Sequence, residues 1–177
     1  MYKKFLYLFL ALALPGLIFL FLKKFGKNEF QVQTYFEEGL KPDSVCSVSS
    51  PAPYQVPDSI VRKIGFEVPM AIRVAIVYPF VKDDLTEVGR IKSKYAQDSV
   101  EILIISGVPN NPKSEIPITF LDFNNFGNLV WCWLRVAEPF SVVVLDKENK
   151  IRGYYDGSKR DEMDRLDMEL SILLKKY

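Results

Sequence analysis

Residues 72–106 read IRVAIVYPFVKDDLTEVGRIKSKYAQDSVEILIIS, and this stretch decides the fold of the chain. Ile72 to Phe80 is a short run of β-branched and aromatic residues, which favours a buried central strand. Val100 to Ser106 is a second run of the same kind. Between them the apolar side chains recur at helical spacing, at Leu85, Val88, Ile91 and Tyr95. A strand, a helix and a strand in about 35 residues predict a βαβ unit with parallel strands.

The acidic pair Asp83 and Asp84 stands where this helix begins. Carboxylates at a helix start accept hydrogen bonds from its first N–H groups and suit its dipole. A hard-cation site is the alternative, and helix capping explains the pair better. Asp161, Glu162 and Asp164 at the start of the last predicted helix are interpreted in the same way.

The C-terminal third of the chain predicts a hairpin and a helix. Phe140 to Leu145 and Ile151 to Tyr155 are apolar runs separated by five polar or charged residues, which is typical of an antiparallel hairpin. Arg160 to Lys176 is an amphipathic helix with an acidic first turn and a basic last turn. Its inward side chains are Met163, Leu166, Leu170, Leu173 and Leu174.

A loop and a shorter helix lie between the second strand and the hairpin. Residues 107–117 hold three prolines and two asparagines, which predicts a loop. We expect a helix over Asn124 to Val136. Trp131 and Trp133 are two residues apart in it, so they face different sides, one in the core and the other partly exposed.

The first 27 residues, MYKKFLYLFLALALPGLIFLFLKKFGK, set the expected layout of the chain. Phe5 to Leu22 is uncharged and bracketed by lysines, and as a helix it spans roughly 27 Å, close to the ~30 Å core of a bilayer. A signal peptide cleaved near Ala11-Leu12-Ala13 is the alternative. Cleavage there would leave the apolar run 17–22 exposed, so an uncleaved transmembrane helix is favoured. Two lysines precede the span and three follow it, so charge gives no orientation.

Three regions follow from this pattern: a membrane anchor over 1–27, an extended tether over 28–58 and a folded domain over 59–177. Five of the 23 basic residues but none of the 22 acidic residues lie in the first 27 positions, which leaves a net charge of −4 for the rest. No basic stripe suggests a nucleic-acid partner. The expected partners are therefore a membrane, through residues 5–22, and a protein.

Histidine is absent from the sequence, and only two cysteines occur, Cys46 and Cys132. The commonest metal ligand and general base is therefore missing. Two cysteines alone cannot make a four-ligand zinc site. We expect neither an enzyme nor a cofactor.

Two segments carry a resemblance to a known family: Glu138 to Asp146, EPFSVVVLD, and Lys150 to Gly157, KIRGYYDG. They resemble the C-terminal third of Sco/SenC-type proteins, which are membrane-anchored, thioredoxin-like copper-delivery proteins that help to assemble cytochrome c oxidase. The resemblance is close over 138–177 and looser over 72–137. It implies an α/β fold, a thioredoxin-like mixed sheet flanked by helices, with the domain on the non-cytoplasmic side.

The chain departs from this family at the residues that hold copper. The family binds copper through a Cys-x-x-x-Cys pair after the first core strand and a histidine just before the third. Here residues 78–84 read YPFVKDD, and Glu138 stands at or beside the histidine position. Copper(I) prefers thiolate and imidazole ligands, so the resemblance implies the scaffold with a degenerate active site. The expected function is a non-catalytic binding or assembly accessory of a respiratory oxidase.

Three residues remain candidates for a special role. Cys46 and Cys132 could form a disulfide if the domain faces an oxidising space. Cys132 could also be an ordinary buried residue, and a copper-binding or thiol-redox pair is the alternative function. Thioredoxin-like folds place a cis proline at the position of Pro139, so we predict a cis Glu138–Pro139 bond, with a trans proline at a strand start as the alternative.

Overall fold

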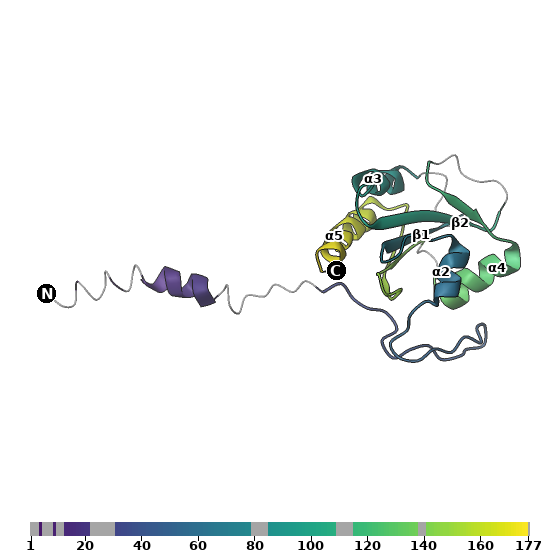
Figure 1. The fold of residues 1–177 in the computed structure, drawn as a ribbon, viewed down its shortest axis with the longest axis horizontal. Helices are drawn as coiled ribbons and strands as arrows, with labels where there is room; N and C mark the ends of the chain where they lie inside the picture. Colours follow the sequence, from purple (N-terminus) through teal and green to yellow (C-terminus); the bar gives the residue numbers. More distant parts are fainter. Residues whose placement is uncertain are drawn as a thin grey trace. The chain divides into compact units, whose positions relative to one another are not determined.

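The structure is a computed structural model that describes residues 4, 9, 13–21, 31–78, 85–108, 115–137 and 141–176. The chain divides into two compact units, Met1–Gln31 and Val32–Tyr177. The second unit is a five-stranded sheet with helices on both faces (Figure 1).

The sheet has the strand order β3-β2-β1-β4-β5. Its strands are β1 (Ile72–Tyr78), β2 (Val100–Ser106), β3 (Ile118–Phe120), β4 (Val142–Leu145) and β5 (Ile151–Tyr155). β1 pairs in parallel with β2 and antiparallel with β4, and β4 pairs antiparallel with β5. A βαβ unit followed by a hairpin in one sheet is a thioredoxin-like topology, and the predicted pairing of the four longer strands is confirmed.

One face of the sheet is covered by α3 (Thr86–Lys94) and α5 (Arg160–Lys176). Ile72, Val74 and Ile76 of β1 belong to this core layer, because alternate residues of a strand point to the same side. The inward residues predicted for both helices are buried in this layer or partly buried against it. α5 has the predicted bounds, with Asp161 and Glu162 in its first turn.

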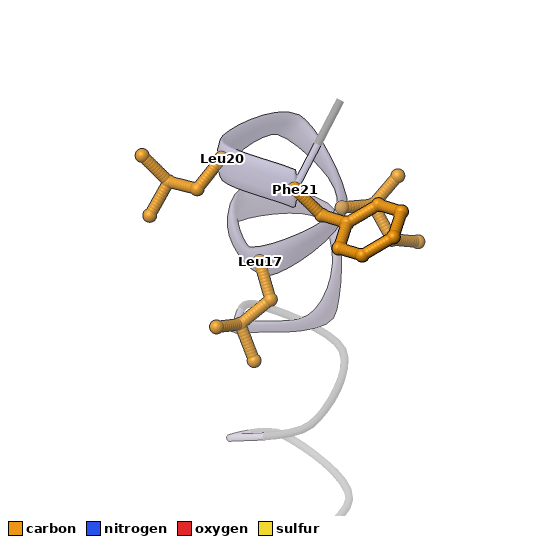
Figure 2. Close-up of a pocket in the computed structure, with 4 residues that line it drawn as sticks. Leu17, Leu20 and Phe21 are labelled. Atoms are coloured by element: carbon orange, nitrogen blue, oxygen red, sulfur yellow. The ribbon is translucent and has the colours of Figure 1, made fainter. Parts of the chain in front are cut away.

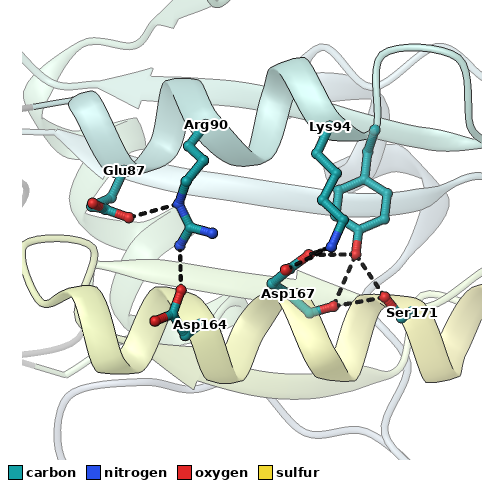
Figure 3. Close-up of polar contacts among 7 residues, drawn as sticks. Glu87, Arg90, Lys94, Asp164, Asp167 and Ser171 are labelled. Carbon is teal, nitrogen blue, oxygen red and sulfur yellow. Dashed lines mark hydrogen bonds and ion pairs between the residues drawn. The ribbon is translucent and has the colours of Figure 1, made fainter.

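Ion pairs join the exposed sides of α3 and α5 (Figure 3). Arg90 Nη2 lies 2.7 Å from Asp164 Oδ1, and Lys94 Nζ lies 2.6 Å from Asp167 Oδ1. The hydroxyl of Tyr95 donates to the backbone oxygen of Asp167 at 2.8 Å. Solvent-exposed ion pairs add little stability, so the apolar layer beneath the two helices stabilises their packing more than these contacts do.

The other face carries α2 (Asp58–Ile64), α4 (Phe123–Gly127) and the π-helix η1 (Asn128–Trp133). Ala75 and Val77 of β1 belong to this layer. α2 ends at Gly65 with φ 102°, where a Cβ would lie 2.7 Å from Oγ1 of Thr119 in β3. Only glycine allows this close approach of the helix end to the strand.

The helix predicted over Asn124 to Val136 is present as α4 and η1, but it ends at Trp133. The chain turns at Arg135, which has a left-handed φ of 53°. The N–H groups of Leu134 and Val136 donate to the carbonyls of Leu129 and Val130, which satisfies the last turn of the helix.

The segment 32–57 belongs to the folded unit, so the predicted boundary between tether and domain at residue 59 is corrected to Val32. Val32, Leu40, Tyr54 and Val56 are buried in the two core layers. The N–H of Tyr35 donates to the carbonyl of Ile151 at the edge strand β5. The segment contains few regular elements, so it has no hydrophobic period, yet its scattered apolar side chains fill the core.

The turn between β4 and β5 is built around the buried carboxylate of Asp146. Its Oδ1 accepts hydrogen bonds from the N–H groups of Glu148 at 2.9 Å and Lys150 at 3.0 Å. Its Oδ2 accepts from Arg152 Nη1 at 3.2 Å, and Nη2 of that guanidinium donates to the carbonyl of Val32 at 2.7 Å. Asp146 and Arg152, two residues of the family resemblance, therefore have a structural role in the hairpin.

In the first unit, residues 13–21 are helical. Leu17, Leu20 and Phe21 project outward from this helix, each more than half exposed (Figure 2). In the part of the chain that the structure describes, no helix has the length and apolar character that a membrane crossing requires. Phe5 and Leu22, the limits of the predicted span, lie outside the described residues.

Candidate functional site

The sheet end where the family resemblance expects a metal site is well defined by strand register. Tyr78 at the end of β1 pairs with Ser106 at the end of β2. The N–H of Val77 donates to the carbonyl of Ser141 just before β4, at 2.7 Å. The carboxyl ends of β1 and β2 therefore lie beside the amino end of β4.

The side chains that would complete this site belong to segments 79–84 and 138–140, which lie outside the described residues. Glu138, Pro139 and the predicted cis bond between them fall in the second segment, and Asp83 and Asp84 fall in the first. Within the described part of the chain, the cis X-Pro bond is Ala52–Pro53, in the N-terminal segment.

The described polar side chains at this end are satisfied locally. Ser106 Oγ donates to the carbonyl of Val108 at 2.8 Å, and Ser141 Oγ accepts from the N–H of Gly157 at 3.0 Å. Asp156 accepts from the N–H and the hydroxyl of Ser158. The described ranges hold no group of three or more Cys, Asp and Glu side chains placed to bind a metal. These groups shape the strand ends.

The two cysteines meet elsewhere, in a disulfide that joins the N-terminal segment to η1. Cys46 and Cys132 are 86 residues apart in sequence, with their Cα atoms 5.3 Å apart. Both are buried, with exposed fractions of 2% and 6%. Of the three interpretations left open by the sequence, the structure contains the disulfide.

Asp43 organises the loop that carries Cys46. Its Oδ1 accepts from the N–H groups of Val45 at 2.9 Å and Cys46 at 2.7 Å, and its Oδ2 accepts from Arg135 Nη1 at 2.6 Å. The hydrogen bond from Arg135, followed by those from the two N–H groups, lowers the pKa of Asp43 to about 2. The loop is therefore fixed to the turn after η1 by an ion pair as well as by the disulfide.

Two buried tyrosines hold the end of η1. The hydroxyl of Tyr54 donates to the carbonyl of Trp133 at 2.7 Å, and the hydroxyl of Tyr154 donates to the carbonyl of Leu134 at 2.8 Å. Burial raises the pKa of both phenols, so they remain donors at any physiological pH. The N-terminal segment and β5 thus position the helix that carries Cys132.

A surface hollow of ≈ 250 Å³ adjoins the disulfide, and Cys132 lines it. Its apolar walls are Val45, Phe123 and Trp131, which are 78%, 76% and 45% exposed. The ring of Trp131 lies close to Gly127, where a Cβ would come within 2.8 Å of Cζ3. Trp131 is exposed and Trp133 is partly buried against the core, as predicted for this pair.

Val45 and Phe123 were not among the predicted site residues. A signal for Phe123 exists in the sequence, because Asp122 is a good N-cap and its side chain accepts from the N–H of Asn125 at 3.1 Å. That cap makes Phe123 the first residue of α4 and turns it to the surface. Val45 lies in a loop without a hydrophobic period, and tertiary contacts position this loop: the disulfide and the Asp43–Arg135 ion pair.

Comparison with known proteins gives distant structural similarities. No family model matches the chain, and no curated protein matches it. A SCO1/SenC family lipoprotein from Bacillus anthracis is similar at 12% identity, with TM-score 0.44 over 59% of this chain and 82% of its own.

BsSco, a member of the Sco family of cytochrome c oxidase assembly proteins, is similar at 12% identity, with TM-score 0.42 over 81% of this chain and 97% of its own. A protein from Bacteroides thetaiotaomicron assigned to the protein disulfide isomerases has 12% identity and TM-score 0.48, over 60% of this chain and 76% of its own. The fold assignment rests on the sheet topology and does not depend on these similarities.

Proposed function

We propose that this chain is a membrane-tethered, thioredoxin-like relative of the Sco/SenC proteins that works without copper or thiol-redox catalysis. Its role is to bind a protein partner as an assembly accessory of a respiratory oxidase. The family assignment in this proposal rests on the segments Glu138 to Asp146 and Lys150 to Gly157 and on the anchor-plus-domain layout.

The observation that carries the proposal is the use of the two cysteines. The chain has two cysteines and no histidine. Cys46 and Cys132 bond to each other, buried between the N-terminal segment and η1. Both thiol ligands are therefore committed to joining two parts of the fold, and copper(I) binds poorly to carboxylates.

Copper(I) titration of the full-length protein in detergent micelles tests this proposal. The protein is expected to compete poorly with a bathocuproine-type chelator for copper(I), both with its disulfide intact and after reduction with a phosphine. The Cys46→Ser/Cys132→Ser double variant is the matched control and should behave in the same way. Stoichiometric copper uptake that disappears in the double variant would contradict the proposal.

An active copper or thiol-redox protein is the second candidate, and the position of Cys132 favours it. Cys132 lines a surface hollow, so a reactant can approach the disulfide from outside. In that case reduction should create a copper site, and single Ser variants at either cysteine should abolish it. The titration described above distinguishes the two candidates.

The membrane anchor and its orientation are part of the proposal. The exposed apolar side chains of the helical residues 13–21 suit a lipid environment, and the disulfide suits an oxidising, non-cytoplasmic space. After reduction with a permeant phosphine, an impermeant maleimide should label the cysteines of intact spheroplasts. Labelling that requires disruption of the inner membrane would reverse the orientation.

A further inference from the structure

We propose that Cys132 is a thiol-exchange site: an incoming thiolate enters the hollow of Val45, Phe123 and Trp131, attacks Cys132 Sγ and displaces Cys46. This inference goes beyond the proposed function. It concerns opening of the bond that holds the N-terminal loop, and it requires neither copper nor catalysis by this chain.

The geometry distinguishes the two sulfur-bearing residues. Cys132 lines the hollow, whereas Cys46 does not line it and is buried, at 2% exposure, within the loop that Asp43 organises. Thiol–disulfide exchange requires access of the nucleophile to one particular sulfur. Of the two cysteines, Cys132 is the one that lines the hollow, so attack is expected at its sulfur.

The hollow is held open by packing within α4 and η1. Gly127 has no side chain, and the ring of Trp131 occupies the space beside it, which keeps this ring at the rim of the hollow. Asn124 and Asn128 also line the hollow and offer amide groups for hydrogen bonds to a peptide-like thiol. The site therefore suits a thiol carried on a peptide or protein with an apolar contact surface.

The exchange balances in two steps. A thiolate RS⁻ forms an S–S bond with Cys132 while the Cys132–Cys46 bond breaks, and Cys46 leaves with the electron pair and takes a proton from water. A second thiolate attacks the R sulfur and releases Cys132 as a thiolate. The chain's disulfide is reduced to two thiols, and two RSH are oxidised to RSSR.

Loss of this bond leaves the loop joined to the turn after η1 by the Asp43–Arg135 ion pair, while the backbone bridge between Leu40 and Ser50 still closes the base of the loop. The loop residue Val45 forms part of the hollow, so opening the disulfide also loosens one of its walls. Exchange at Cys132 thus changes the surface that a partner would contact.

Adduct mapping tests the assignment. The oxidised full-length protein is treated with limiting reduced glutathione, quenched with acid, alkylated with N-ethylmaleimide and digested for mass spectrometry. Glutathione should appear on Cys132 and maleimide on Cys46, with roughly tenfold preference over the reverse pattern. The proposal would be overturned if glutathione preferred Cys46 or labelled both cysteines equally. It would also be overturned if the folded protein gave no adduct while the urea-unfolded protein reacted.

Two further arms test the hollow and the source of the thiol. Asn128→Trp places a bulky ring on its lining and should slow glutathione attack roughly tenfold, whereas Met168→Trp on the exposed side of α5 should leave the rate unchanged. Equal rates in both variants would contradict entry through the hollow.

The source of the thiol is tested by comparing reduced thioredoxin with glutathione at equal thiol concentration. If thioredoxin reduces the disulfide faster, the site is assigned to a protein thiol. If glutathione is faster, the site is assigned to a small thiol.

Discussion

Asp43 and Arg135 are 92 residues apart in sequence and form an ion pair with 2.6 Å between Oδ2 and Nη1. Asp43 also caps the loop of Cys46, and Arg135 stands in a left-handed turn just after η1. The pair therefore links the same two parts of the chain as the disulfide does, but it responds to pH and salt, whereas the disulfide responds to redox state.

The first prediction concerns this pH dependence. The pKa of Asp43 falls from 3.8 to about 2 in the folded state, so its contribution is present above pH 4 and is lost as the pH falls towards 2. Asp43→Asn should have a lower Tm than the wild type at pH 6, and the difference should shrink as the pH approaches 2. Arg135→Met should show the same convergence, because it removes the same pair; a pH-independent difference would contradict this assignment.

The second prediction concerns the disulfide. The bond closes a loop of 86 residues, and its loss in Cys46→Ser/Cys132→Ser should lower the free energy of unfolding by about 2–5 kcal/mol. Urea denaturation followed by circular dichroism measures the change. The wild type under reducing conditions should match the double variant, and the double variant should be insensitive to reductant. Equal stability of oxidised and reduced wild type would contradict the prediction.

The third prediction concerns the buried carboxylate in the β4–β5 turn. Asp146→Ala leaves the Arg152 guanidinium buried without its ion-pair partner and should cost about 3–5 kcal/mol. Glu148→Gln, in the same turn, breaks an exposed pair with Lys150 and should change stability little. If the two variants lose equal stability by denaturant titration, the turn does not depend on the buried pair.

The fourth prediction concerns the two tyrosines at the end of η1. Tyr54→Phe and Tyr154→Phe each remove a donor to a carbonyl at the end of η1 and should cost about 1–3 kcal/mol. Hydrogen exchange measured by NMR should show faster opening of η1 in both variants. Tyr35→Phe is a control, because Tyr35 packs against Tyr154 with its ring 5.0 Å away and its backbone N–H makes the bond to β5. Unchanged exchange in η1 would exclude the capping role.

The strands and the last helix were predictable because the spacing of their apolar residues along the sequence matches the spacing of the buried side chains in the structure. Val74 and Ile76 alternate with Ala75 and Val77 between two apolar layers, which gives the continuous apolar run of a central strand. β3 was missed because it has three residues and follows a proline-rich loop. The N-terminal boundary was missed because Leu40 and Tyr54 lie in irregular segments, where burial has no sequence period.

The candidate site was less predictable, for a different physical reason. The sequence names Cys46 and Cys132 as partners but cannot give their distance, which depends on how the loop of Asp43 lies against η1. Disulfide pairing and the hollow beside it are tertiary features. Local propensity carries no information on either.

The position of the N-terminal segment against β5 affects how this protein can be divided. β5 is the last strand of the sheet, and Tyr35 N–H and the carbonyl of Val32 bind Ile151 and Arg152 along it. A fragment that starts at residue 59 would expose this edge strand, which promotes addition of a strand from another molecule. It would also leave Cys132 as a free thiol, which promotes intermolecular disulfide crosslinking. A fragment that starts at residue 31 keeps the edge covered, so it should stay monomeric where the shorter one aggregates.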